Sequence, residues 1–304
     1  MKGKDLLSIA DLSSEEIQSL ITTATRLKLG QRRHLLEGRI LALIFEKPSL
    51  RTRVSFDVAM KHLGGDAIYL SQSEVGLGQR EPISDVAQVL SRYVDGIVAR
   101  TFSHKSVELL AQHASIPVIN GLSDEEHPCQ VLSDLLTIYE KKGKLEGLIV
   151  AYIGDANNVA NSLLLACSLM GVDFRIASPK GYGPKDKLLN KVRTISVPRD
   201  PKEAAKNADV VYTDVWTSMG QEAEAERRRA AFSSYQVDKA LLSLAKRDAI
   251  FMHPLPAHHG EEIAEGILEL PQSVVFDQAE NRLHMQKAIL VKLLGGLCPN
   301  PSLP

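Results

Sequence analysis

Residues 40–56 read ILALIFEKPSLRTRVSF, an apolar run followed at once by a helix start. The apolar part, Ile40–Phe45, is short enough to be a buried strand. Pro48 and Ser49 interrupt it, and Ser49 is a suitable N-cap for a helix beginning at Leu50. The stretch therefore predicts a strand, a short turn and a helix.

The start of this predicted helix has the properties of an anion site. The first backbone N–H groups of a helix lack partners within the helix, and the helix dipole makes that end positive. Leu50, Arg51 and Thr52 occupy the first turn, where Arg51 adds a bidentate cation and Thr52 a hydroxyl donor. Phosphate suits such an end. Taken alone, however, the motif fits a capped helix with solvated arginines better, so the rest of the chain must decide.

Strand-like and helix-like segments alternate along the rest of the chain. A capping box at residues 13–16 opens a helix that Gly30 ends, whereas the polar segment Ser71–Glu81 predicts a mobile loop. This alternation predicts two doubly wound, Rossmann-like α/β domains with parallel sheets and a cleft between them. The further predicted strands are Ala67–Leu70, Gly96–Ala99, Ile116–Ile119, Leu148–Ile153, Phe174–Ala177, Val210–Tyr212, Ala249–Met252 and Val274–Phe276.

The length of 304 residues exceeds one typical core and indicates two domains. The charged stretch Lys141–Lys144 marks the boundary, so we expect a first domain at 1–142 and a second at 143–280. Residues 281–304 are expected to form a C-terminal helix that returns to the first domain.

Composition and charge exclude several classes of protein. A hydrophobic content of 44% and a net charge of −1 fit a globular protein and leave no basic footprint for nucleic acid or anionic membrane. No apolar run reaches the ~20 residues needed to span a bilayer, and the N-terminus lacks a signal-peptide core. Three scattered cysteines suggest neither a disulfide framework nor a zinc site. We therefore expect a cytoplasmic protein.

Two further groups fall at the carboxyl edge of the first predicted sheet. Arg100 ends a strand, and His127 precedes a helix that begins at Pro128 and carries Gln130 one turn later. Each has a simple structural alternative: Arg100 as a surface arginine and His127 as a capping residue. Together with Ser49–Thr52, however, they place three sets of donors at one edge, which favours a carbamoyl or phosphoryl ligand.

The second half carries weaker signals. Asp214 follows a strand and could accept from an ammonium group, and Gly220 allows a turn with exposed N–H groups; an ordinary Asx loop is the alternative. Asn157 and Asn158 fit a helix cap. The His258-His259 pair has no third ligand at suitable spacing, so we expect no metal. The turn at Gly154 lacks the full glycine fingerprint of dinucleotide sites.

These motifs resemble the aspartate/ornithine carbamoyltransferase family over essentially the whole chain. Residues 45–53 resemble its phosphate-binding signature and His127–Gln130 its carbamoyl-binding signature. Residues 214–220 resemble the ornithine branch, while 253–262 and 279–282 complete the match. The resemblance implies transfer of the carbamoyl group of carbamoyl phosphate to the δ-amine of L-ornithine, without a cofactor. It also implies arginine biosynthesis and a homotrimer in which loop 71–81 completes a neighbour's site.

The resemblance also implies residue roles. Catalysis is expected of Arg51, Thr52, Arg100, His127, Gln130 and Asp214. Carbamoyl phosphate is expected to bind Ser49, Leu50, Arg51, Thr52, Arg100, His127, Pro128, Cys129, Gln130 and Arg282. Ornithine is expected to bind Asn158, Asp214, Ser218, Met219, Pro254 and Leu255.

The chain departs from the family pattern at three positions: Leu50 replaces a threonine, Gly76 a glutamine and Pro254 the cysteine of the ornithine branch. Ala257, where the aspartate branch has arginine, argues against aspartate. Other acceptors (putrescine, acylated ornithine or aspartate) and a non-catalytic ligand-binding paralogue remain alternatives. A nicotinamide-dependent enzyme is a further one, suggested by the fold only.

Overall fold

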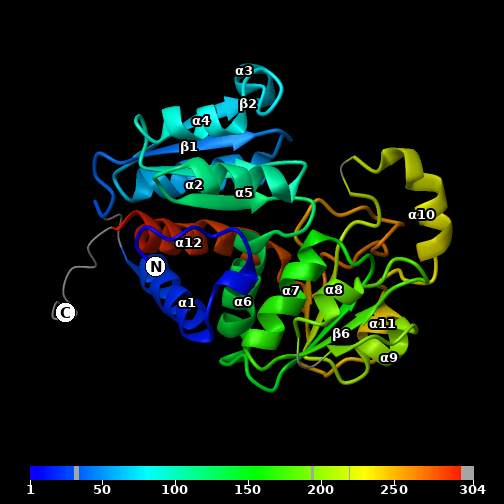
Figure 1. Ribbon diagram of the computed structural model, residues 1–304. Coiled ribbons are helices and arrows are strands. Elements are labelled where there is room, and N and C mark those ends of the chain that lie inside the picture. Colours follow the sequence, from blue (N-terminus) through cyan, green and yellow to red (C-terminus); the bar gives the residue numbers. More distant parts are fainter. Residues whose placement is uncertain (31–33, 193–194, 219, 296–304) are drawn as a thin grey trace. The chain divides into compact units, whose positions relative to one another are not determined.

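The computed structural model describes residues 1–30, 34–192, 195–218 and 220–295, and it divides into two compact units (Figure 1). Unit 1 comprises residues 1–136 together with the chain from Asn281 onward, and unit 2 comprises Thr137–Glu280. The first division point lies inside helix α6 (Pro128–Lys142), ahead of the charged stretch where we placed the boundary. The second lies inside helix α12 (Val275–Leu294). The predicted pair of α/β domains is confirmed.

Unit 1 is built on a parallel four-stranded sheet in the order β2-β1-β3-β4. The chain passes from β1 outward to β2 and then returns to β3 on the other side of β1. Ligands of doubly wound sheets bind at such a switch point, beyond the carboxyl ends of the strands. The elements are 3-10 helix η1 (Ile9–Asp11), α1 (Ser14–Leu29), β1 (Ile40–Phe45), α2 (Leu50–His62), β2 (Asp66–Ser71), α3 (Gln72–Val75), α4 (Ile83–Leu90), β3 (Gly96–Arg100), α5 (His104–His113) and β4 (Val118–Leu122).

Unit 2 repeats this arrangement with a parallel five-stranded sheet in the order β7-β6-β5-β8-β9. Its switch point lies between β5 and β8. The elements are β5 (Ile149–Ile153), α7 (Asn158–Leu169), β6 (Asp173–Ala177), α8 (Asp186–Leu189), β7 (Ile195–Ser196), α9 (Pro201–Ala205), β8 (Val210–Thr213), 3-10 helix η2 (Glu222–Glu224), α10 (Ala225–Phe232), α11 (Lys239–Leu242) and β9 (Ile250–Met252).

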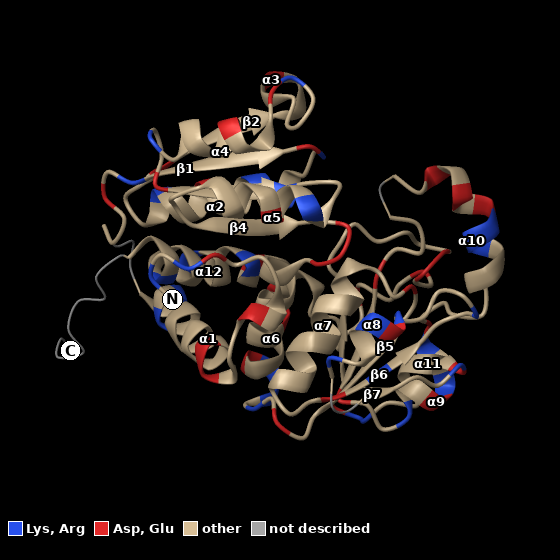
Figure 2. Cartoon of the chain, in the orientation of Figure 1, with Lys and Arg blue, Asp and Glu red and all other residues tan. Residues whose placement is uncertain are grey.

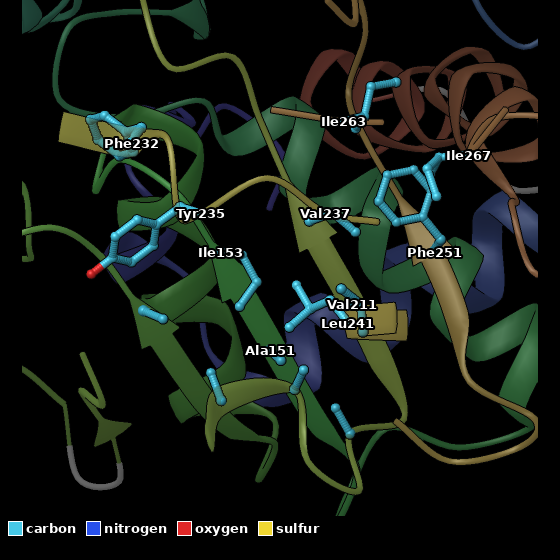
Figure 3. Close-up of a cluster of buried hydrophobic side chains, with 14 of the residues drawn as sticks. Ala151, Ile153, Val211, Phe232, Tyr235, Val237, Leu241, Phe251, Ile263 and Ile267 are labelled. Atoms are coloured by element: carbon cyan, nitrogen blue, oxygen red, sulfur yellow. The ribbon is translucent and has the colours of Figure 1, made fainter. Parts of the chain in front are cut away.

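The core of unit 2 explains how its strands are held (Figure 3). Ala151 and Ile153 alternate along β5 and therefore point to the same face, where they join Val211 of β8 and Phe251 of β9. Phe232, the last residue of α10, is fully buried in the same cluster. The cluster thus links the central strands to the segments that follow β8.

The chain ends both contribute to unit 1. Leu6 pairs with Ile119 beside β4, and Asn120 N–H donates to Leu6 O over 2.8 Å. Lys287 of α12 is buried and donates to Leu27 O, in the last turn of α1, over 2.9 Å. Unit 1 is therefore assembled from the beginning and the end of the chain.

Some predicted elements are corrected. Val274–Phe276 is not a strand, since α12 begins at Val275; a short apolar run cannot by itself distinguish a strand from a helix start. Segment 71–81 contains a helical turn, α3, opened by a Ser71–Glu74 capping box. The last strand of unit 1 begins at Val118 rather than Ile116.

Basic and acidic residues are interspersed along the chain in both units (Figure 2). Helix α10, for example, carries acidic and basic residues together. Within the described ranges, no helix combines the length and apolar character needed to span a bilayer.

Candidate active site

The N-terminus of α2 has the predicted cap. Ser49 Oγ accepts from Thr52 N–H at 3.3 Å and donates to Thr52 Oγ1 at 3.1 Å. Leu50 is 76% exposed, so its side chain takes no part in the buried contacts. Arg51 follows it in the first turn, and Thr52 is fully buried. The strand–turn–helix inferred from residues 40–56 is confirmed.

Arg100 ends β3, next to the end of β1, where Phe45 and Arg100 are register partners. The loops that follow the two strands are tied together. Glu46 N–H donates to Arg100 O at 2.8 Å, and the Glu46 carboxylate accepts from Phe102 N–H at 2.7 Å. Lys47 Nζ lies 4.5 Å from the centre of the Phe102 ring. These contacts place Arg100 at the switch point of the sheet, close to the start of α2.

Arg100 is only 8% exposed, and its Nε has no hydrogen-bond partner among the described residues. Arg100 also forms no ion pair with the described chain. Burial, together with the positive charges of Arg282 and Arg51, lowers the pKa of Arg100 to about 10. The side chain stays protonated at neutral pH, at a free-energy cost that a bound anion would remove.

His127 immediately precedes α6, as predicted, and is buried. Burial, then Arg282 and Arg100, lower the pKa of His127 well below its usual value. The imidazole is therefore neutral at pH 7 and suited to donate one hydrogen bond to a carbonyl oxygen. Gln130 Nε2 donates to Asp134 Oδ1 at 2.9 Å. Gln130 Oε1 is buried and accepts no hydrogen bond from the described residues.

Pro128 and Cys129 follow His127 at the start of α6. Pro128 is the first residue of α6, and Cys129 Sγ donates to Asn120 O at 3.4 Å. Burial raises the pKa of Cys129 to about 12, so the thiol is not a nucleophile at neutral pH. The Cys129 side chain is therefore held within unit 1 by burial and by its contact with β4.

Arg282, on α12, lies against the start of α2. Its Nη2 donates to Thr52 Oγ1 at 2.7 Å. Since Thr52 Oγ1 accepts from both Ser49 and Arg282, its own O–H is left to donate elsewhere. The positive charges of Arg282 and Arg51 are close enough to lower the pKa of Arg100. Three guanidinium groups, a hydroxyl and a neutral imidazole thus converge in unit 1, which suits a multiply charged anion with a carbonyl group.

In unit 2, Asp214 follows β8 and is held from two sides. Asn157 Nδ2 donates to Asp214 Oδ2 at 2.7 Å, and Val215 N–H donates to Oδ1 at 2.8 Å. Asn157 is the N-cap of α7, and its Oδ1 accepts from Val159 and Ala160. That cap orients the amide so that its NH₂ group faces Asp214. Asn157, which the sequence indicated only as a cap, therefore also positions the carboxylate.

The electrostatic surroundings of Asp214 suit a cationic ligand. Burial raises the pKa of Asp214, while His253, Asn157 and Val215 partly oppose the increase. A buried carboxylate with only two neutral hydrogen-bond donors retains capacity for further donors. An ammonium group would supply them together with the missing positive charge.

Leu255 lies after β9 and has φ of +58°, a conformation that leucine rarely adopts. Its N–H donates to His253 Nδ1 at 2.9 Å, which places the ring proton of His253 on Nε2. That Nε2 lies 3.3 Å from the buried carboxylate of Glu262. The sequence did not indicate this role for Glu262. Pro254 is buried beside them, where it offers no thiol.

A buried cation also supports the segment after β8, and sequence inspection missed it. Arg228 Nη1 donates to Asp155 Oδ2 and to Trp216 O, both at 2.9 Å. The Trp216 ring stacks on Phe232 at 5.9 Å between centroids. Nothing in the sequence indicates this pair, because its members lie 73 residues apart. Arg228 thus fixes the backbone two residues after Asp214.

Replacing Arg228 by alanine should destabilise the protein by about 3–5 kcal/mol, the usual loss when one partner of a buried ion pair is removed. Asp155 would be left as an uncompensated buried carboxylate. Thermal and denaturant unfolding will measure the effect. Arg227→Ala is the matched control because Arg227 is the exposed neighbour on the same helix. Equal stability of the two variants would contradict the role given to the ion pair.

Three further residues are predicted from the sequence to bind ornithine: Asn158, Ser218 and Met219. Asn158 is the first residue of α7. Ser218 N–H donates to Gln221 Oε1 at 3.1 Å, so the turn that contains Ser218 is held by its own side chains. Met219 lies outside the described residues.

The ends of the strands thus carry a group of arginines in unit 1 and a buried carboxylate in unit 2. Two family models match the chain. The carbamoyl-phosphate-binding domain of aspartate/ornithine carbamoyltransferases matches residues 4–140, and their aspartate/ornithine-binding domain matches residues 146–293. The chain belongs to the aspartate/ornithine carbamoyltransferase family, and it is a carbamoyltransferase.

Similar proteins within this family are named ornithine carbamoyltransferases. The chain is 53% identical to the ornithine carbamoyltransferase of Pyrococcus abyssi, covering 98% of each sequence. It is 55% identical to the Anoxybacillus flavithermus ornithine carbamoyltransferase, covering 97% of this chain and 98% of the relative. The solved structure of the Pyrococcus furiosus ornithine carbamoyltransferase superimposes with a TM-score of 0.94 at 52% identity, covering 97% of this chain and 98% of that one.

Proposed function

We propose that this enzyme transfers the carbamoyl group of carbamoyl phosphate to the δ-amine of L-ornithine, giving L-citrulline and phosphate. The observation that carries the proposal is the buried group of Arg100, Arg282 and Thr52 in unit 1. It suits a phosphorylated substrate. The names of the relatives support ornithine as the acceptor.

In unit 1, Ser49, Arg51 and Thr52 bind the phosphate at the N-terminus of α2, where the helix dipole is positive. Leu50 contributes its backbone N–H only. Arg100, His127 and Gln130 bind the carbamoyl group, and Arg282 reaches the same substrate.

In unit 2, Asp214 accepts from the α-ammonium group of ornithine. Asn158, Ser218 and Met219 bind its α-amino and α-carboxylate groups, and Pro254 and Leu255 lie against the reacting end.

The reaction needs a free amine. The δ-amine has a pKa of about 10 in water, judged from lysine, so it must lose a proton before it attacks the carbamoyl carbon. Negative charge then develops on the carbonyl oxygen, where Thr52, Arg100 and His127 donate hydrogen bonds. Arg51 and Arg282 stabilise the departing phosphate, which can itself take the amine proton. A thiol at position 254 is then not required.

We expect ornithine to be preferred over putrescine and aspartate. Putrescine would leave the groups that bind the α-carboxylate unpaired, which costs about 1–3 kcal/mol for each buried contact. Aspartate carries a side-chain carboxylate, for which Ser218, Met219 and Gly220 provide no matching cation. The test is kcat/KM for the three amines with carbamoyl phosphate. A ratio that favours either rival would leave the family assignment intact and the ornithine assignment wrong.

We further propose a cytoplasmic homotrimer that acts in arginine biosynthesis. In unit 1, Leu50 and Val54 are 76% and 48% exposed and lie four residues apart, on one face of α2. Ile68, on the neighbouring edge strand β2, is 47% exposed. These apolar side chains suit a contact between copies of the chain, and light scattering after size exclusion will give the mass of the assembly.

A further inference from the structure

A buried carboxylate that takes no part in the proposed chemistry lies directly before His127. It belongs to Glu126, which is 8% exposed and sits in the loop between β4 and α6. Its side chain reaches back to residues near the start of the chain. Ser8 Oγ donates to Glu126 Oε1, and Ile9 N–H donates to Glu126 Oε2 at 3.0 Å. Glu126 thus joins the residue before His127 to partners 118 and 117 positions away in the sequence.

Ser123 closes the same loop from within. Ser123 N–H donates to Glu126 O at 2.9 Å, and Ser123 Oγ accepts from Glu126 N–H at 3.3 Å. Ser123 Oγ in turn lies 2.8 Å from His104 Nδ1 and accepts from Asn120 Nδ2 at 3.3 Å. The N–H, the C=O and the carboxylate of Glu126 are therefore all bonded within unit 1, so both its backbone and its side chain are fixed.

The N-terminal segment is a firm anchor for Glu126 because it is itself attached to β4. Leu6 N–H donates to Val118 O, at the start of that strand, over 2.9 Å. Ser8 is the N-cap of η1, and its Oγ accepts from Ala10 N–H at 3.0 Å. A hydroxyl that accepts one bond from Ala10 and donates its proton to Glu126 has a fixed orientation. The carboxylate is therefore held by a part of the fold that does not depend on the loop.

We propose that Glu126 is a positioning residue for His127, through which the N-terminal segment sets the geometry of carbamoyl transfer. Peptide units are rigid, so fixing Glu126 restricts where the next residue can lie. His127 also precedes Pro128, and the residue before a proline is largely confined to extended backbone. Without the Glu126 carboxylate, the imidazole shifts from the carbamoyl oxygen, and a misplacement on the order of 1 Å can cost about a hundredfold in rate. This inference rests on the carbamoyl-binding role proposed for His127.

Two matched controls separate positioning from a general loss of stability. Glu125→Ala removes the exposed carboxylate next to Glu126 in the same loop. Ser13→Ala removes the N-cap of α1, where Ser13 Oγ accepts from Glu16 N–H at 3.2 Å, and so weakens a helix start just as Ser8→Ala does. Neither control touches the Glu126 carboxylate, so neither should change kcat. A Ser13→Ala variant that loses as much activity as Ser8→Ala would overturn the link between Ser8 and His127.

The binding test compares inorganic phosphate with carbamoyl phosphate by calorimetry, in the absence of an acceptor. Inorganic phosphate has no carbamoyl group for His127 to bind, so Glu126→Ala should bind it like the wild type. The affinity of Glu126→Ala for carbamoyl phosphate should fall about 2- to 10-fold, the net contribution of one hydrogen bond. Equal losses for the two ligands would show that Glu126 supports the whole anion site, and this result, like no loss for either ligand, overturns the proposal.

The activity test measures kcat for citrulline formation. Glu126→Ala should lower kcat at least about tenfold, and Ser8→Ala, which removes one of the two bonds, should lower it less. Glu126→Gln keeps an acceptor for Ile9 N–H and should recover most of the rate. An unchanged kcat in Glu126→Ala overturns the proposal. A wild type that forms no citrulline overturns the proposed function instead, while the binding test, which needs no acceptor, still decides the role of Glu126.

Discussion

Replacing Arg100 by methionine should abolish tight binding of carbamoyl phosphate and at the same time raise the thermal stability of the protein. Arg100 is buried without an ion-pair partner among the described residues, next to two further arginines. Hydrogen bonds to charged groups contribute about 1.5–3 kcal/mol each, so loss of a two-bond contact weakens binding more than about a hundredfold. Methionine fills a similar volume without the cost of a buried charge.

Calorimetry with inorganic phosphate and steady-state kinetics with carbamoyl phosphate will measure the first effect, and thermal unfolding the second. Arg100→Lys keeps the charge but lacks the planar fork, so it should restore only part of the affinity. Arg39→Met is the control, since Arg39 pairs with Asp95 at the other end of the sheet. A destabilised Arg100→Met protein that still binds phosphate would show that Arg100 is structural.

Asp214→Asn should cut kcat/KM for ornithine by about 10- to 150-fold, the equivalent of one lost hydrogen bond to a charged group. The reason is specific to this site. Asn157 already presents its NH₂ group to Asp214, so a new amide at 214 either opposes a donor with a donor or gives up the acceptor that the α-ammonium group needs. The affinity for carbamoyl phosphate, which we assign to unit 1, should not change.

Initial rates at varied ornithine and varied carbamoyl phosphate will separate the two effects. Asp173→Asn is the matched control. Asp173 is the first residue of β6, so it lies where the strands of this sheet begin, and it pairs with Arg175. An Asp214→Asn enzyme with unchanged ornithine kinetics would remove Asp214 from the acceptor site.

Local signals in the sequence predicted much of the fold. The capping box at Ser13 and the cap at Ser49 each depend on residues within one helical turn, and both are present. The prediction of a strand at Val274–Phe276 is wrong because three apolar residues are too few to show a helical or strand periodicity. The two-residue strand β7 is too short to leave any pattern.

The candidate site was predicted where its parts are strand ends and helix starts, such as Arg100 and His127. The supporting contacts could not be predicted, because they join positions distant in sequence. Arg228 finds Asp155 across 73 residues, and Arg282 finds Thr52 across 230. The contact of the Asn157 NH₂ group with Asp214 could not be predicted either, because the cap role already explained the residue.

The assembly of unit 1 from both ends of the chain sets an order for folding during synthesis. Domains generally fold as they leave the ribosome, N-terminal part first. Here the residues of unit 2 emerge as one continuous run, whereas unit 1 needs Arg282 and Lys287, which are translated after all of unit 2. Residues 1–136 must therefore wait, incompletely packed, while the later unit folds ahead of them. Arg282 can reach Thr52 only after the whole of unit 2 has been translated.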